Sequence, residues 1–267
     1  MTPRVLTDET FELGECPVWC AERRSLFWSD INAGAVWERD AAGTITQIAS
    51  GTPVGALLLD TETNLLLFRA ADIVRRTARE LTPIGTFPAD GAERFNDAIA
   101  LADGSVLAGT IDLAAPRAGV YHYARDTGPR RVLGPTGISN GMALSPDQRW
   151  LYWSDSTAGT ISRYALGPDG PDASSGTVLH TGDSTPDGLA SDEEGCLWSA
   201  RWGGSCVLRI SPAGEVIDRV ALPVPNVTSV AFGGSDLRSL YITTFEGPLY
   251  VVETDVRGLP EHRADIG

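Results

Sequence analysis

The chain has 267 residues, with 35 Asp and Glu against 21 Lys and Arg, so its formal net charge is −14 at pH 7. All 21 cationic residues are arginine, which excludes Schiff-base, pyridoxal-phosphate and phosphate-loop chemistry that needs a lysine. Only three histidines occur, so a zinc site built mainly of imidazoles is disfavoured. An acidic chain with scattered arginines is also poorly suited to nucleic acid or an anionic membrane surface.

The composition is that of a soluble globular protein, since 42% of the residues are hydrophobic and 21% are charged. No apolar stretch is long enough to span a membrane, and the N-terminus lacks the apolar region of a signal peptide. The four cysteines have no paired Cys-x-x-Cys spacing, so we expect reduced thiols rather than a zinc site. These features predict a cytoplasmic protein, monomeric or a small homo-oligomer, that binds neither nucleic acid nor membrane.

Short β-rich runs recur along the whole chain, and each is followed by a turn and a second run. No segment of 12 or more residues has a helical period, and residues 70–81 read as a hairpin of strands. The first runs span residues 26–30, 65–68, 106–110, 151–155, 197–201 and 240–244, and the second runs span 34–39, 73–76, 119–123, 159–164, 206–210 and 248–252.

The first runs start 39 to 46 residues apart, and six units of this length account for the chain. Such a period, with several strands per unit, is typical of a β-propeller. The copies also resemble one another, because Phe-Trp-Ser-Asp at 27–30 returns as Tyr-Trp-Ser-Asp at 152–155. A two-sheet sandwich does not predict six similar steps. We therefore predict an all-β protein, a six-bladed β-propeller that forms a single domain over residues 1–267.

In five of the six units, polar residues interrupt the β pattern at nearly the same position. Propeller sites lie at one mouth of the central channel, where strands from every blade converge. Polar groups that share a phase of the repeat should therefore point to one place on the axis. These residues, 9 to 12 positions before the next first run, are Glu15, Asn96 with Asp97, Asn140, Asp187, and Thr228 with Ser229.

Glu15, Asn140 and Asp187 offer two carboxylates and one amide oxygen. This hard, oxygen-only set suits calcium, magnesium or manganese. Taken alone, Asn140 and Asp187 would each be a turn residue because glycine follows, and Glu15 would be an exposed charge. The shared phase favours a site over those readings.

A second match is Gly-Ile-Ser-Asn-Gly at 137–141, which fits the G-x-S-x-G pattern of a nucleophile elbow. That elbow needs a strand before the serine and a helix after it. Here the following residues lead through a turn into another strand, so we interpret the match as chance.

Five motifs in a fixed order resemble those of the senescence-marker-protein/gluconolactonase/regucalcin family over nearly the full length. They are Leu-Gly-Glu-Cys-Pro-Val-Trp at 13–19, Arg-Phe-Asn-Asp at 94–97, Gly-Ile-Ser-Asn-Gly-Met-Ala-Leu-Ser-Pro-Asp at 137–147, Pro-Asp-Gly-Leu-Ala at 186–190 and Val-Thr-Ser-Val-Ala-Phe-Gly-Gly at 227–234. The resemblance implies a six-bladed propeller and hydrolysis of a sugar lactone, an aldonolactone to its aldonic acid, with one divalent metal ion.

Carried over by motif, the resemblance implies that Glu15, Asn140 and Asp187 are the metal ligands and that Arg94 and Asn96 contact the substrate. Asp187 is also implied as the general base, against the alternative of water activated by the ion itself. Calcium is the expected ion, with zinc, magnesium, manganese or iron(II) as alternatives. The implied partner is a small-molecule sugar lactone, whose carbonyl the ion would polarise while water attacks.

Two departures from the family pattern bear on the site. Cys16 stands where the family commonly has glycine, and a thiol there would either alter metal preference and redox sensitivity or be buried and neutral. Residues 111–115 do not match the family's substrate loop, which leaves Asp112 as a further candidate contact.

The alternatives to a lactonase are a non-catalytic calcium-binding or regulatory propeller and a hydrolase of another ester or phosphotriester. Arg94 and Asn96 favour a polyhydroxylated substrate.

Overall fold

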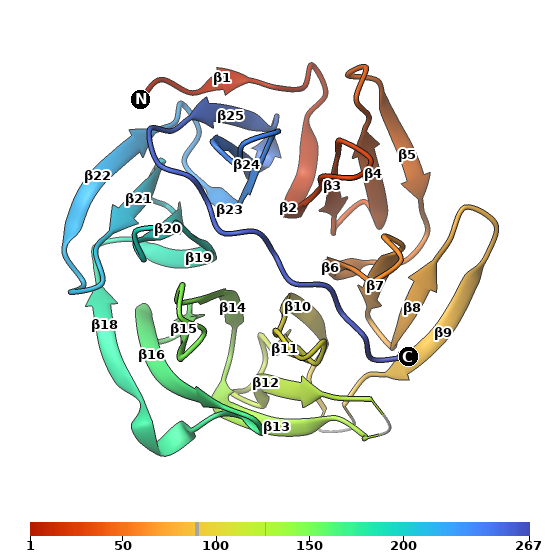
Figure 1. Cartoon of the computed structure of the whole chain (residues 1–267), viewed down its shortest axis with the longest axis vertical. Helices are drawn as coiled ribbons and strands as arrows, with labels where there is room; N and C mark the ends of the chain where they lie inside the picture. The colour runs from red at the N-terminus through yellow and green to blue at the C-terminus, as the bar shows by residue number, and fades with distance from the viewer. Residues whose placement is uncertain (89–90, 126) are drawn as a thin grey trace.

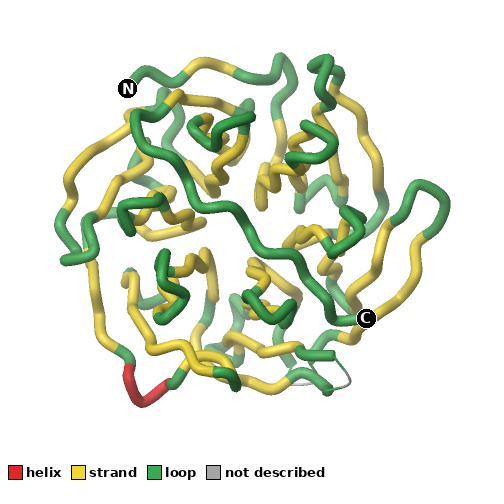
Figure 2. The backbone as a smooth tube through the Cα atoms, in the orientation of Figure 1, coloured by secondary structure: helices red, strands yellow, loops and turns green. Residues whose placement is uncertain are grey.

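The computed structural model describes residues 1–88, 91–125 and 127–267. In that part of the chain nearly all regular structure is β-strand, and the one helical segment is a single 3-10 turn, η1 (Ala173–Ser175) (Figure 2). The sheets stand around a central axis as the blades of a propeller do (Figure 1). The prediction of an all-β chain is confirmed. None of the described helices is long and apolar enough to cross a membrane.

The strands nearest the axis surround the centre of the ring (Figure 1). Each contacts the inner strand before it and the one after it along the chain, and the last of them contacts the first. In chain order they are β2 (Phe11–Cys20), β6 (Val54–Leu59), β10 (Arg94–Ala100), β14 (Ser139–Leu144), β19 (Thr185–Ser191) and β23 (Val227–Gly233).

The next strand outward in each unit is the one that the repeat predicted from its β-branched, aromatic and leucine residues. Every first run lies in such a strand, which pairs antiparallel with its inner strand. They are β3 (Ser25–Asp30), β7 (Leu65–Arg69), β11 (Val106–Ile111), β15 (Trp150–Asp155), β20 (Leu197–Trp202) and β24 (Ser239–Gly247).

The remaining strands complete the sheets on the outside of the ring. The predicted hairpin at 70–81 is confirmed as β8 and β9, and its second strand continues to residue 86. The outer strands are β4 (Ala35–Arg39), β5 (Ile45–Ala49), β8 (Asp72–Arg76), β9 (Leu81–Thr86), β12 (Ala118–Tyr123), β13 (Arg130–Thr136), β16 (Thr160–Gly167), β17 (Gly170–Pro171), β18 (Thr177–Thr181), β21 (Cys206–Ile210), β22 (Val216–Ala221), β25 (Tyr250–Glu253) and β1 (Arg4–Val5).

Hydrogen bonding divides the described strands into five sheets, where the repeat predicted six separate ones. Three sheets have four strands, one has five, and one has eight in the order β1-β25-β24-β2-β3-β4-β5 with β23 paired to β24. The eight-stranded sheet arises because β2 pairs with two strands: its later residues pair with β3, and its first residues pair with β24 at Phe11–Gly247 and Leu13–Phe245.

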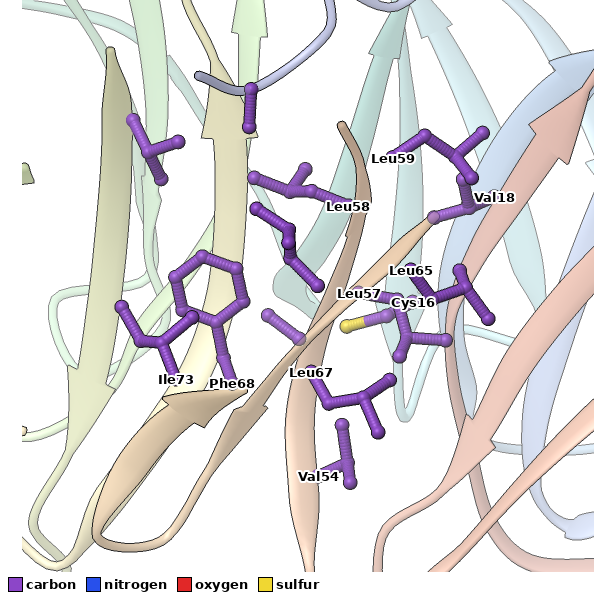
Figure 3. Close-up of a cluster of buried hydrophobic side chains, with 14 of the residues drawn as sticks. Cys16, Val18, Val54, Leu57, Leu58, Leu59, Leu65, Leu67, Phe68 and Ile73 are labelled. Carbon is purple, nitrogen blue, oxygen red and sulfur yellow. The ribbon is translucent and has the colours of Figure 1, made fainter. Parts of the chain in front are cut away.

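Apolar side chains fill the space between neighbouring sheets. Figure 3 shows one such cluster, in which Val18, Leu57, Leu67 and Phe68 from three strands are at most 3% exposed. Burying a side chain of this size contributes about 1.5–3 kcal/mol. These contacts hold the blades in the ring and so fix the inner strands relative to one another.

After β25 the chain crosses the central opening of the ring (Figure 1). This C-terminal strap, residues 254–267, bonds to the ring at several points: Leu259 N donates to Ser191 O at 2.9 Å, and Ala264 N donates to Leu59 O at 2.9 Å. Ser191 and Leu59 are the last residues of β19 and β6. The strap therefore lies at the C-terminal ends of the inner strands and covers that mouth of the channel.

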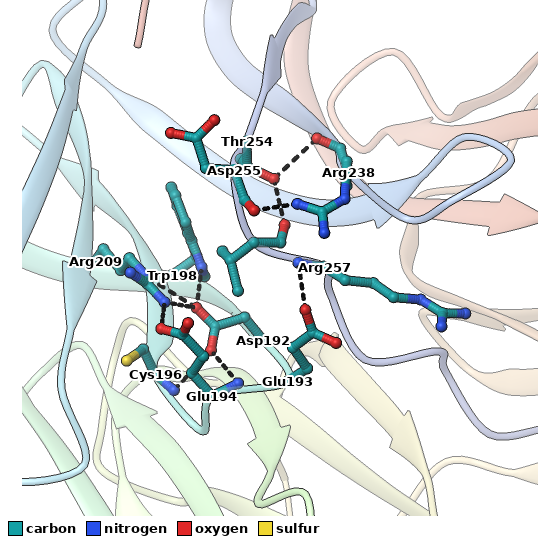
Figure 4. A network of polar contacts seen from close by, with 11 residues as sticks. Asp192, Glu193, Glu194, Cys196, Trp198, Arg209, Arg238, Thr254, Asp255 and Arg257 are labelled. Atoms are coloured by element: carbon teal, nitrogen blue, oxygen red, sulfur yellow. Dashed lines mark hydrogen bonds and ion pairs between the residues drawn. The ribbon is translucent and has the colours of Figure 1, made fainter.

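The start of the strap is held by a polar network (Figure 4). Thr254 Oγ1 donates to the carbonyl oxygens of Arg238, at 2.9 Å, and of Val256, at 2.7 Å. Glu193 and Arg257 exchange bonds, since Glu193 N donates to Arg257 O at 2.8 Å and Arg257 N donates to Glu193 Oε1 at 3.3 Å. The strap is thus tied both to its own sheet and to the turn after β19.

Candidate functional site

Every inner strand contains an irregularity in its pairing with the next strand outward, and the polar residues of the repeat lie at these irregularities. A β-bulge bends its strand and redirects the side chain of the extra residue, and bulges are frequent beside active sites. The shared phase seen in the sequence thus corresponds to a shared structural position. The register shifts lie between Glu15 and Val18, Val54 and Ala56, Phe95 and Asp97, Ser139 and Met142, Pro186 and Leu189, and Val227 and Ser229.

The glycines that follow Asn140 and Asp187 let the inner strands approach closely at the axis. A Cβ on Gly141 would lie 2.3 Å from Leu189 N, and one on Gly188 would lie 2.2 Å from Ser229 Oγ. Both glycines are inside strands rather than in turns. The Asn-Gly and Asp-Gly pairs are therefore packing features that bring neighbouring inner strands together.

Glu15, Asn140 and Asp187 are brought together at the axis and are withdrawn from solvent, with exposures of 6%, 7% and 5%. The Asn140 side chain hydrogen-bonds Asp187, and its Nδ2 also donates to Ser156 Oγ at 3.2 Å. The Oδ1 atom of Asp187 has no hydrogen-bond partner among the described residues. A buried carboxylate oxygen of this kind carries a desolvation cost that a ligand would offset.

Burial and nearby negative charge raise the pKa of both carboxyl groups. Burial, followed by the charge of Asp97, raises the pKa of Glu15 to about 8, although the Cys16 N–H and Arg94 oppose the shift. Burial, and then the charges of Glu15 and Asp97, raise the pKa of Asp187 well above its ordinary value. Ionising both groups without a counterion is therefore unfavourable, and a bound cation would relieve the repulsion.

Asp97 is a third carboxyl group of this cluster. It lies half-buried on β10, and burial raises its pKa to about 7, with the charge of Glu261 from the C-terminal strap acting in the same direction. The shared phase of the repeat predicted that Asp97 points to the same place on the axis as Glu15 and Asp187, but it did not assign Asp97 a role in the site.

Arg94 and Asn96 form one hydrogen-bonded unit on the same strand. Arg94 Nη1 donates to Asn96 Oδ1 at 2.8 Å, and Asn96 Nδ2 donates to the carbonyl oxygen of Ser139 at 3.0 Å. The Arg94 guanidinium is half-buried, and burial lowers its pKa while the charge of Glu15 raises it. The structure thus places a cation and an amide beside the carboxylates.

Cys16 holds Glu15 through its backbone. Its φ of 47° lies in the left-handed region that favours glycine, and its N–H donates to Glu15 Oε2 at 3.0 Å. The thiol instead donates to the carbonyl oxygen of Gly55 at 3.0 Å, and burial raises its pKa well above the ordinary value. Of the two expectations for this residue, the structure favours the buried, neutral thiol.

Arg201 is a buried cation that the sequence did not reveal. It is 1% exposed and donates to Ser184 Oγ at 3.1 Å, to the Ser184 carbonyl oxygen and to Ser199 Oγ at 3.4 Å. No carboxylate of the described residues lies within ion-pair distance of it. Burial lowers its pKa, and the charge of Asp187 acts in the opposite direction. An arginine within a strand reads as a surface residue, so no sequence signal identified it.

Two other expectations concern residues near this mouth. Asp112 is buried and paired with Arg117, and its Oδ1 accepts from the backbone N–H groups of Ala114 and Ala115, both at 3.0 Å; these bonds shape its own loop and do not favour a substrate contact. Ser139 begins a strand with no helix after it, and its Oγ accepts from Trp153 Nε1 at 2.9 Å. The prediction that it is not a nucleophile elbow is confirmed.

A cavity of ≈ 90 Å³ follows the axis from the bulges toward the C-terminal strap. Asp97 and Ser229 line it from the ring, and strap residues Leu259 to His262 close it. His262 Nε2 lies 2.9 Å from Gln148 Oε1, which fixes the strap there. The strap covers one mouth, so a substrate would reach Glu15 and Asp187 from the other.

The donor set fits a hard divalent cation. Two buried carboxylates and one amide are oxygen ligands of the kind that calcium and magnesium take, and Asp187 Oδ1 lacks a partner in the described part of the chain. Among all described residues, no group of three or more His, Cys, Asp or Glu side chains is placed so that it could hold a metal. An ion here would therefore need the Asn140 oxygen beside Glu15 and Asp187.

Curated relatives resemble this chain over most of its length. One is the 6-deoxy-6-sulfogluconolactonase of Pseudomonas putida, 36% identical over 243 residues, which cover 87% of this chain and 83% of that protein. Another is the pentonolactonase XacC of Haloferax volcanii, 30% identical over 292 residues, covering 100% of this chain and 99% of that protein.

Solved structures share the fold. A calcium-binding protein, regucalcin, from Agrobacterium tumefaciens superposes with a TM-score of 0.92 at 24% identity, covering 99% of this chain and 97% of that one. The family pattern described as the SMP-30/gluconolactonase/LRE-like region matches residues 13–246. The chain therefore belongs to the SMP-30/gluconolactonase/LRE-like family.

Proposed function

We propose that this chain hydrolyses a sugar lactone, an aldonolactone, to the corresponding aldonic acid. The observation that carries the proposal is the buried pair Glu15 and Asp187, with Asp187 Oδ1 unpartnered among the described residues and hydrogen-bonded Arg94 and Asn96 beside it. The names of the two relatives, which refer to a sulfogluconolactone and a pentonolactone, support the substrate class.

The scaffold for this activity is a six-bladed propeller that forms one domain over residues 1–267. In this proposal the eight-stranded sheet is two blades, β2 to β5 and β23 to β25 with β1, joined where β2 and β24 pair. Six inner strands with six matching bulges support the count.

Glu15, Asn140 and Asp187 would hold one divalent cation. Calcium is the first choice because all three donors are hard oxygens, and the similar regucalcin structure is described as calcium-binding; zinc, magnesium, manganese and iron(II) are the alternatives. A bound cation would supply Lewis-acid polarisation of the lactone carbonyl and stabilise negative charge on its oxygen.

The chain's own residues would bind the sugar and move the proton. Asn96 keeps one N–H and one lone pair after its two hydrogen bonds, so it can bind a hydroxyl together with Arg94. Asp187 would accept a proton from the water that attacks the carbonyl carbon. The ring C–O bond then breaks, the leaving alkoxide takes up a proton, and the product is a hydroxy acid.

A panel of five- and six-carbon aldonolactones, assayed by acid release with and without EDTA, tests this function. The wild type should hydrolyse at least one lactone and lose the activity in EDTA. Asp187→Ala should fall about 10³-fold or more in kcat, while Asp183→Ala, an exposed acid ahead of the same strand, should match the wild type. Full activity of a folded Asp187→Ala variant would falsify the assignment.

The second candidate is a calcium-binding propeller without catalysis. The observation in its favour is the fold similarity to a protein described as calcium-binding, and the same three residues would serve it. Calcium binding with no hydrolysis of any lactone in the panel would select this candidate.

A further inference from the structure

Trp202 is the one aromatic residue among the exposed large hydrophobic side chains of the described residues, at 36% exposure. It packs on Phe245 from the next sheet, with ring centroids 5.1 Å apart and planes inclined at 53°. Nearer the strap in the same interface, Trp198 packs on Phe232 with ring centroids 5.7 Å apart, and there both rings are buried. The pair of Trp202 and Phe245 therefore repeats a core contact but leaves aromatic surface open.

The open pair lies at the mouth that holds the candidate site. Trp202 pairs with Thr185, the first residue of β19 and two residues before Asp187. Phe245 pairs with Leu13, two residues before Glu15. The C-terminal strap instead meets the opposite ends of the inner strands, so it does not cover this pair.

The pair also lies across the channel from the polar contacts. The inner strands follow one another around the axis in chain order, which puts β10, carrying Arg94 and Asn96, three positions from β23 in either direction. Trp202 and Phe245 come from β20 and β24, the partners of β19 and β23, on the far side of the ring (Figure 1). A ligand over the carboxylates thus meets a cation and an amide on one side and an aromatic surface on the other.

We infer that Trp202, supported by Phe245, is a specificity-determining residue that stacks on the C–H face of the sugar lactone while Arg94 and Asn96 bind its hydroxyls. A sugar ring has such a division, with hydroxyls at its edge and C–H bonds on its face, and an exposed tryptophan offers a flat surface for that face. The inference rests on the proposed lactonase function and assigns it a stacking surface.

The test uses the full chain with its metal and the aldonolactone that the wild type hydrolyses fastest. Trp202→Ala should raise KM about five- to tenfold and change kcat less than about twofold, because the stacking is made with substrate and transition state alike. Trp202→Phe keeps a ring and should lie in between. Trp150→Phe, at the strap end of β15 with its ring under Arg163, is the control and should match the wild type.

Tryptophan fluorescence gives a second readout that does not depend on turnover. Titration with the aldonic acid product should change the emission of the wild type and of Trp150→Phe but not of Trp202→Phe, which also decides the matter if Trp202→Ala does not fold. The stacking role alone is overturned if folded Trp202→Ala has the KM of the wild type. It is also overturned if the emission of Trp202→Phe responds to the product as the wild type does. A wild type that hydrolyses no lactone overturns the proposed function, and the stacking role with it.

Discussion

Glu15 and Asp187 combine burial with like charge, and that combination sets their behaviour with pH. A carboxyl group whose pKa is higher in the folded chain than in the unfolded chain favours unfolding wherever only the unfolded form is ionised. Glu15 meets this condition, with a pKa raised from 4.5 to about 8. The metal-free chain should therefore lose stability as the pH rises through that window.

Glu15→Gln should remove part of this pH dependence, because the amide keeps the shape of the side chain and does not ionise. Urea unfolding in EDTA at pH 5 and pH 8 should show a loss of a few kcal/mol for the wild type, on the order of 1.4 kcal/mol per unit of pKa shift, and a smaller loss for the variant. Glu246→Gln, at an exposed site, is the control. Equal losses in all three proteins would contradict the assigned cause.

At the residue scale the sequence located Glu15, Asn96, Asn140 and Asp187, since each stands at a fixed phase of a repeat that folding turns into one point on the axis. It did not reveal Arg201, whose burial depends on Ser184 and Ser199. Contacts of this kind leave no periodic pattern along the chain.

At the element scale, the approach of one inner strand to the next depends on glycine. Gly188→Ala would put its Cβ 2.2 Å from Ser229 Oγ and 2.6 Å from Ser229 Cα, so β19 and β23 would have to separate. We expect a loss of about 1–3 kcal/mol in the free energy of unfolding, measured by urea denaturation. Gly128→Ala, which would meet no atom within 4 Å, should be close to neutral, and equal stability of the two variants would refute the packing role.

The strands themselves were predictable because the repeat marks two strands of each unit, the one beside the inner strand and the next one outward. The union of two units into an eight-stranded sheet was not, because it depends on two residue pairs between β2 and β24. Those residues are more than 200 positions apart in the chain. Local patterns carry no information on such a pairing.

At the scale of the whole molecule, the C-terminal strap joins blades that are far apart in the ring. Ala264 is fully buried where the strap bonds to Leu59. Ala264→Asp would bury a carboxylate there and should cost roughly 2–4 kcal/mol, seen as a lower Tm. The exposed Ala42→Asp adds the same charge and should leave the Tm nearly unchanged; a similar Tm for both variants would show that the strap does not hold the ring.

The strap was not predicted, because residues 254–267 have no β period and make their bonds one at a time to separate turns and strand ends. Its position nevertheless determines which mouth is open. The open mouth is the one with Asp187, Arg94 and Trp202, which matches the direction from which a lactone would have to enter.

The most direct test of whether Glu15, Asn140 and Asp187 form a metal-dependent site is to ask whether added metal restores lactone hydrolysis. The chain is stripped with EDTA, and acid release from an aldonolactone is followed as calcium, and then zinc, magnesium, manganese or iron(II), is added back. The wild type should fall to the rate of the buffer and recover with one of these ions, and Asp187→Asn should not recover with any. A stripped wild type that hydrolyses the lactone at its full rate would contradict the proposal.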